Sequence, residues 1–341
     1  MTRRHQLAIG VLLAALLLAF VLQGVDWNAL AQALRNARPL PLLAVVLVTV
    51  AAYWVRAWRW GSLLAPLTRV GLHDLFSATM VGFAASLIVP RSGELLRPWL
   101  VARRHPVPTA AGFATIVIER LIDLMTVLAL FALYFLALPR PQAQSDNPIM
   151  GAVGAAGGAA ALIALALLAL LLALHANAAR ALAVLERLLA RAPRWLAQPL
   201  GRVLHSFAGG LAVLRAPALH LALIGLQSLA LWLLTALSFQ LVQIAFGIDL
   251  PFHTNFLLIA FLVVGESIPT PGLVGGFHAF YVLALAEVYG VDRTAAVAAS
   301  IAAHALTNLP VLLLGMAYLG REGLSFRRLG EAAQARPTRE G

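Results

Sequence analysis

Long apolar stretches separated by short polar segments dominate this chain, a pattern typical of membrane-spanning helices. About 20 apolar residues cross the ~30 Å hydrocarbon core, and tilt absorbs some mismatch in length. Six runs are long enough to cross on this basis: Leu7–Leu22, Leu40–Val55, Gly112–Leu138, Ile149–Leu174, Leu219–Phe246 and Thr294–Leu319. We predict an all-α polytopic membrane protein with one integral domain, residues 1–320, followed by a basic cytoplasmic tail, residues 321–341.

Three further apolar runs are too short to cross alone: Leu75–Pro90, Asn255–Ile268 and Gly276–Tyr289. A helix over the first of them reaches only about 22 Å at 1.5 Å per residue. We expect it to enter from the inside and to return through Ser92–Arg104. The other two are expected to form a second hairpin that enters from the outside. Charge does not separate re-entry from two crossings there, but short limbs and a Pro/Gly tip favour re-entry. Six full transmembrane helices plus two opposed re-entrant hairpins indicate a transporter-like site at the midplane.

Composition and charge support a membrane location. The chain is 61% hydrophobic and only 11% charged, too few charges for the surface of a soluble protein. Its 25 basic residues are all arginines, and the net charge is +11. By the positive-inside rule most of them, Arg56 and Arg59 included, are assigned to the cytoplasmic side together with both termini. The amphipathic segment 177–215 is expected to lie on the inner surface. The excess charge then indicates anionic lipid rather than nucleic acid as a partner.

The tip of the first predicted hairpin is unusually polar for its depth. Pro90 and Gly93 break the helix, and Glu94 and Arg97 restart it with an i,i+3 spacing at which the two charges can pair. Irregular backbone at membrane depth is tolerated only where protein or water satisfies its polar groups. The tip is therefore expected to line a cavity or to pack inside the bundle.

Arg91 has no nearby partner in the sequence. A lone guanidinium at membrane depth costs at least ~2.5–3.5 kcal/mol unless an anion meets it. Glu119 and Asp123, i,i+4 on the third full span with Arg120 beside them, are two candidates. A lipid phosphate is the third, because the guanidinium fork matches its geometry. These charged groups can serve as a buried neutralising network, as a substrate site, or as both.

The second tip is rich in proline and glycine: Pro269, Pro271, Gly272 and Gly276 surround it, and His278 follows. We consider His278 the better functional candidate of the outer side and expect it near the mouth of a polar path. The other ionisable groups at this depth are Glu266 and His304. A lone histidine on an apolar helix is more often a packed, hydrogen-bonded residue, and we interpret His304 in that way.

An ordered set of motifs along the chain is more specific than any one of them: Arg56-x-x-Arg59-Trp60, Pro90-Arg91-Ser92-Gly93-Glu94-x-x-Arg97, Glu119-Arg120-x-x-Asp123, and Pro269-Thr270-Pro271-Gly272 followed by Gly275-Gly276. In this set the chain resembles the flippase-like family defined by the transmembrane domain of lysylphosphatidylglycerol synthetases. The resemblance implies movement of a modified lipid between leaflets. We predict a substrate site formed by residues of both tips and of the third span: Arg91, Glu94, Arg97, Glu119, Arg120, Asp123, Pro269, Pro271, Gly272, Gly276 and His278. The chain departs from the family at His278, where an acid is usual, and at Ser86, where many members have asparagine.

The leading hypothesis is a translocase or lipid-binding transporter for an anionic or modified phospholipid or a polyprenyl-linked lipid. One alternative is a polyprenyl-pyrophosphate phosphatase-like enzyme, in which Pro90–Gly93 mimics a phosphate loop. Another is a non-transporting partner of a lipid synthase. We expect no catalytic residues, metal or cofactor. The expected partners are lipids with an anionic headgroup or a polyprenyl phosphate, together with a second copy or a separate lipid-modifying enzyme. The expected location is a bacterial-type cytoplasmic (inner) membrane.

Overall fold

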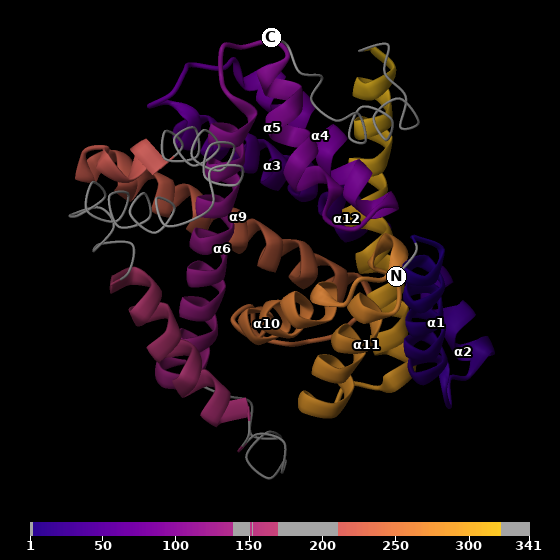
Figure 1. Ribbon diagram of the computed structural model, residues 1–341. Helices are drawn as coiled ribbons and strands as arrows, with labels where there is room; N and C mark the ends of the chain where they lie inside the picture. Colours follow the sequence, from indigo (N-terminus) through magenta and orange to yellow (C-terminus); the bar gives the residue numbers. More distant parts are fainter. Residues whose placement is uncertain (1–2, 139–150, 152, 170–210, 322–341) are drawn as a thin grey trace.

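The computed structural model describes residues 3–138, 151, 153–169 and 211–321, and every regular element in these ranges is helical (Figure 1). The first half contains α1 (Arg3–Leu22), α2 (Trp27–Asn36), α3 (Pro39–Leu64), α4 (Leu72–Ile88), α5 (Ser92–Ala102) and α6 (Thr109–Ala137). After a helix at Val153–Ala169, the second half contains the 3-10 turn η2 (Leu211–Arg215), α9 (Ala218–Ala245), α10 (Thr254–Ser267), the 3-10 turn η3 (Pro271–Leu273), α11 (Gly276–Val282), the π-helical turn η4 (Leu283–Val288) and α12 (Arg293–Arg321).

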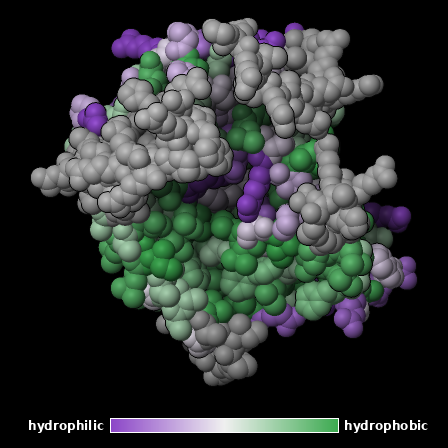
Figure 2. Space-filling view, in the orientation of Figure 1, coloured by the Kyte–Doolittle hydropathy of each residue, from purple (hydrophilic) through white to green (hydrophobic). Residues whose placement is uncertain are grey.

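Four stretches of the described chain are long and apolar enough to cross a membrane: α3, α9, α12 and Pro271–Val288. The segments Gly10–Leu22 and Trp27–Asn36 pass the same test together but are bent by 89°. Apolar side chains such as Leu40 and Leu219 point outward, and Figure 2 shows a broad hydrophobic band. The prediction of a multi-pass helical membrane protein is confirmed. Most of the segment 177–215 and nearly all of the tail 321–341 lie outside the described residues.

Two pairs of packed helices lie where the hairpins were predicted, α4 with α5 and α10 with α11. Of the expected re-entrant limbs, Gly276–Tyr289 falls largely within the stretch Pro271–Val288, which is long and apolar enough to cross. In the first pair, Gly82 and Gly93 face each other so closely that a Cβ on Gly93 would collide with the carbonyl oxygen of Gly82. Gly265 and Gly276 make the same close approach in the second pair. Only glycine permits this separation, because any larger residue would place atoms where the other backbone lies.

These elements form an inverted repeat. A long helix, a helical hairpin and a second long helix occur first as α3 to α6 and again as α9 to α12. The step along the sequence from Gly82 to Gly265 equals the step from Gly93 to Gly276. The two leading helices pack side by side and run antiparallel, since the Arg38 amide at the start of α3 bonds to Ala245 at the end of α9. Each hairpin also packs on the last helix of the other half, α4 on α12 and α10 on α6.

The crossing glycines provide the first prediction. Gly93→Ala should force α4 and α5 apart and lower stability by about 1–3 kcal/mol, the usual cost of overpacking. Thermal unfolding in detergent should show a fall in midpoint of several degrees. The matched control is Gly225→Ala in α9, where an added Cβ meets nothing within 4 Å. An equal midpoint for the Gly93 and Gly225 variants would contradict the close approach.

Candidate functional site

Two buried carboxylates, Glu119 and Asp123, form the centre of a network of arginines in the middle of α6. They lie one helical turn apart and face the same direction. Their four cationic partners come from three helices: Arg56 and Arg59 from α3, Arg97 from α5, and Arg120 from α6 itself. The network therefore joins helices that are distant in the sequence and fixes the first hairpin against α6.

Arg97 makes the best-formed pair of the network. Its two terminal nitrogens donate to the two oxygens of Glu119, each over 3.1 Å, and its guanidinium lies 4.4 Å from the ring centre of Trp60. Two parallel hydrogen bonds to one carboxylate add geometric specificity to the charge pairing. The sequence spacing suggested that Arg97 pairs with Glu94. The structure instead directs Arg97 to Glu119, and Glu94 has no ion pair within the described ranges.

Arg59 is fully buried, with 0% of its surface exposed. Its Nη1 donates to Asp123 Oδ1 over 2.6 Å and to the hydroxyl of Ser228 over 2.7 Å. Trp232 of α9 donates to the same carboxylate oxygen over 3.1 Å. Arg56 and Arg59 thus face a buried carboxylate network, which the count of arginines by side did not predict.

Positive charge exceeds negative charge in this network. Four arginines surround two carboxylates, and several buried nitrogens have no hydrogen-bond partner within the described residues: Arg56 Nε, Arg59 Nε and Nη2, Arg97 Nε, and Arg120 Nε. An unpaired donor or charge in a low-dielectric interior is costly. An anion that reached these groups would satisfy them, so the arrangement is chemically suited to bind one.

A cavity of about 300 Å³ lies where the two hairpins approach each other. One wall belongs to the first half and carries the charged residues Arg56, Arg91, Glu94, Arg97 and Arg120. The facing wall belongs to the second half and is mainly apolar, with Leu231, Phe239, Ile259, Leu262 and Phe277. Glu119 and Asp123 lie behind the charged wall and hold its arginines in place. The cavity is thus amphipathic.

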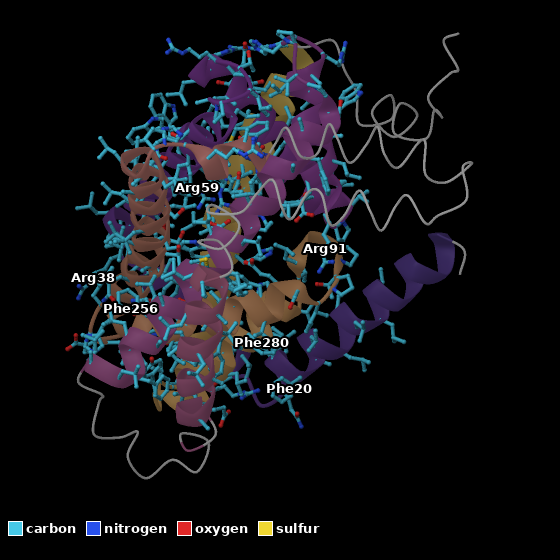
Figure 3. The ribbon with its side chains drawn as sticks, turned by 60° about the vertical axis from the view of Figure 1, so that its left-hand side comes forward. Phe20, Arg38, Arg59, Arg91, Phe256 and Phe280 are labelled. Carbon is cyan, nitrogen blue, oxygen red and sulfur yellow. The ribbon has the colours of Figure 1, made fainter. Side chains whose placement is uncertain are left out.

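Arg91 is the residue at the bend of the first hairpin. Its backbone is left-handed, with φ of 64°, a conformation that most side chains avoid. Figure 3 shows Arg91 beside the tip of the second hairpin and Arg59 within the helical bundle. Neither Glu119 nor Asp123 pairs with Arg91, and no other described carboxylate does. Its guanidinium is therefore available to a ligand in the cavity.

The second tip is arranged differently from the prediction. Pro269 lines the cavity, whereas Pro271 and Gly272 form the turn η3, and the Gly272 carbonyl accepts a 2.8 Å hydrogen bond from His304. Gly276 is one of the crossing glycines. His278 is 7% exposed, lies 4.8 Å from His304 between ring centres, and is not among the cavity-lining residues. The role of His278 near the mouth of a polar path stays a prediction, whereas the packed, hydrogen-bonded state expected of His304 is confirmed.

The site can also be compared with what the sequence predicted about metals and about its arginines. In the described part of the chain, no three His, Asp or Glu side chains converge to hold a metal ion. Sequence reasoning also left Arg56 and Arg59 out of the site. Their i,i+3 spacing within an apolar helix, next to Trp60, was the signal that could have identified them.

Comparison with known proteins agrees with this architecture. The family described as the lysylphosphatidylglycerol synthase TM region matches residues 7–315, nearly the whole chain. The chain is also 26% identical over 339 residues to a protein of Haloferax volcanii named glycosyltransferase AglD. That match covers 92% of this chain and 54% of the relative, so the chain spans about half the length of the curated protein.

The network provides a second prediction. Arg97→Gln should strand the buried Glu119 carboxylate, and breaking a buried pair in this way typically costs about 3–5 kcal/mol. The control is Arg104→Gln, which removes an exposed pair with Asp74 and should cost no more than about 1 kcal/mol. Thermal unfolding of the two variants in detergent measures the difference. Equal, small losses would show that the Arg97–Glu119 pair does not support the bundle.

Proposed function

We propose a lipid-translocating function for this chain, which belongs to the family of the lysylphosphatidylglycerol synthase TM region. In this proposal the cavity binds the phosphate of an anionic or modified phospholipid, or of a polyprenyl-linked lipid. The protein then moves that headgroup between the leaflets of a cytoplasmic (inner) membrane. We assign no chemical step and no cofactor to the chain.

The observation that carries the proposal is the amphipathic cavity between the two hairpin tips. Guanidinium groups match phosphate oxygens in geometry and charge, and Arg56, Arg91, Arg97 and Arg120 all line one wall. The opposite wall suits the apolar part of a lipid next to its headgroup. A volume of about 300 Å³ accepts a headgroup but not a pair of acyl chains, since pockets for whole drug-sized molecules start at about this size. The chains would stay in the bilayer.

The inverted repeat supports movement rather than static binding. Inverted repeats with short, broken helices at the midplane are typical of secondary transporters, in which one half moves against the other around a shared site. Here both halves contribute a hairpin to one cavity. We propose that the chain crosses the membrane six times, that the two hairpins enter from opposite faces, and that they control access from the two sides.

The similarity to a glycosyltransferase favours a second role. Because the chain matches about half of that relative, the membrane region could serve as the lipid-presenting part of an enzyme whose chemistry resides elsewhere. In this role the partner is a separate lipid-modifying enzyme, or a second copy of the chain provides the contact. Binding of a phosphate lipid without leaflet exchange would favour this role over translocation.

Topology provides the third prediction. The chain has no cysteine, so single cysteines can be introduced without background. Arg69 and Asp249 are exposed residues in the corresponding loops after α3 and α9. In an inverted repeat these loops face opposite sides, and by the positive-inside rule we propose that Arg69 lies inside. In intact cells Asp249→Cys should react with an impermeant maleimide and Arg69→Cys should be protected. The same reactivity at both positions would contradict the inverted arrangement.

Arg91 provides the fourth prediction, a test of the proposed function. Purified protein in liposomes should accelerate leaflet exchange of a fluorescent phosphatidylglycerol or polyprenyl phosphate. The measurement is the loss of fluorescence when dithionite reduces the probe in the outer leaflet. Arg91→Gln should remove most of this activity, by roughly tenfold or more, because a charge-assisted bond to phosphate is lost. It should unfold at the wild-type temperature, since no described ion pair is broken.

The matched control for Arg91 is Arg35→Gln, an exposed arginine on α2. This variant should retain wild-type exchange and stability. Wild-type exchange no faster than in protein-free liposomes, for both lipids, would remove the translocase proposal. Loss of folding in Arg91→Gln would assign that residue to the scaffold instead.

A further inference from the structure

Glu266 is a carboxylate that the site described above leaves without a role. It lies in the last turn of α10, its side chain is exposed, and it lines the same cavity as the arginines. It is the only charged residue that the second half contributes to the described lining of this cavity. Within the described ranges it makes no hydrogen bond and no ion pair, in contrast to Glu119 and Asp123.

The charges that act on Glu266 come from the opposite wall. Arg56 and Arg120 line the same cavity as Glu266 and come from the other half. Arg120 keeps 40% of its side chain exposed. The carboxylates that already pair with these arginines are Glu119 and Asp123, which belong to the first half and remain with the arginines in any motion of one half against the other. Glu266 belongs to the other half, so its distance from the arginines changes when the halves move.

A carrier with this cavity faces an electrostatic problem on its empty return. When a lipid phosphate is bound, it neutralises the excess positive charge of the arginines that line the cavity. Without it, uncompensated guanidinium charge would have to remain at membrane depth while the halves rearrange, and such charge is costly there. An internal anion that approaches the arginines only in the absence of phosphate would remove this cost.

We propose that Glu266 is this internal anion: its carboxylate takes the place of the lipid phosphate opposite Arg56 and Arg120 when the cavity is empty. The inference rests on the proposed translocation. It predicts that Glu266 is needed when the halves rearrange without bound lipid (the empty return) and not when they rearrange with lipid bound (the loaded step). Net transfer in one direction requires both steps, whereas one-for-one exchange of lipid requires only the loaded step.

The test separates these two modes in vesicles of digalactosyldiacylglycerol, a lipid without phosphate. The probe is the fluorescent phosphate lipid, of the two above, that the wild type moves. It is added to the outer leaflet, and its entry is measured as the fraction of fluorescence that dithionite no longer removes. Potassium on both sides with valinomycin prevents a membrane potential. In the net arm the vesicles contain no other phosphate lipid. In the exchange arm the same lipid, unlabelled, is present in both leaflets beforehand.

The Glu266→Gln variant should slow net entry by roughly tenfold or more while exchange stays within about twofold of wild type, as expected when charge at membrane depth is left uncompensated. The control is Glu287→Gln, the same chemical change at an exposed carboxylate that pairs with Arg293 outside the cavity. It should leave both arms unchanged. Unfolding temperatures equal to wild type show that neither variant is misfolded.

Each outcome has one meaning. An equal effect of Glu266→Gln on both arms, whether a loss or no change, overturns the role of Glu266 and leaves the translocase proposal in place. If the wild type moves lipid in neither arm, the proposed function fails, and the inference fails with it. Slow net entry with normal exchange supports the inference.

Discussion

The buried pairing of arginines with Glu119 and Asp123 is the interaction on which the rest of the structure depends. Guanidinium groups from α3, α5 and α6 can be placed inside an apolar bundle only because α6 supplies two carboxylates one turn apart. Removing a single partner would leave an uncompensated charge in a low-dielectric interior. The network therefore fixes the relative positions of these helices, and α9 joins it through Ser228 and Trp232.

The carboxylates of this network neutralise only part of its positive charge. The excess positive charge faces the space between the hairpins, while the other half presents apolar side chains. The repeat shows this contrast directly: the crossing glycines Gly93 and Gly276 align the two hairpins, and Glu94 and Arg97 then correspond to Phe277 and Phe280. One architecture thus provides a charged wall and an apolar wall, the two surfaces that a lipid next to its phosphate requires.

Much of this organisation could be predicted from the sequence, and the failures have a common physical cause. Run length correctly predicted three of the long apolar helices that could cross a membrane, α3, α9 and α12, and helix-breaking residues marked the bends between α4 and α5 and between α10 and α11. Counting arginines by side did not bring Arg56 and Arg59 into the network with Glu119 and Asp123, because a topology rule contains no information on which face of a helix points inward. The packing of His278 against His304 could not be predicted either, since proximity to the tip does not show which way a side chain points. The repeat was hidden because its interior residues differ in polarity, and only the backbone contacts are retained.

The retained backbone contacts explain how two halves with such different interior side chains can form one cavity. The close approaches Gly82–Gly93 and Gly265–Gly276 determine hairpin geometry through the backbone alone, so the exposed faces of the hairpins are free to differ. In the proposed translocase, a single ligand site would have to lie where both halves meet, because it must be reached from two sides. The cavity occupies that place: α3 and α9 pack along it, and the tips of both hairpins close it. In this proposal the arginine charge needs to be present on only one half. The other half then supplies the mainly apolar wall, which approaches the arginines and withdraws from them when the halves move.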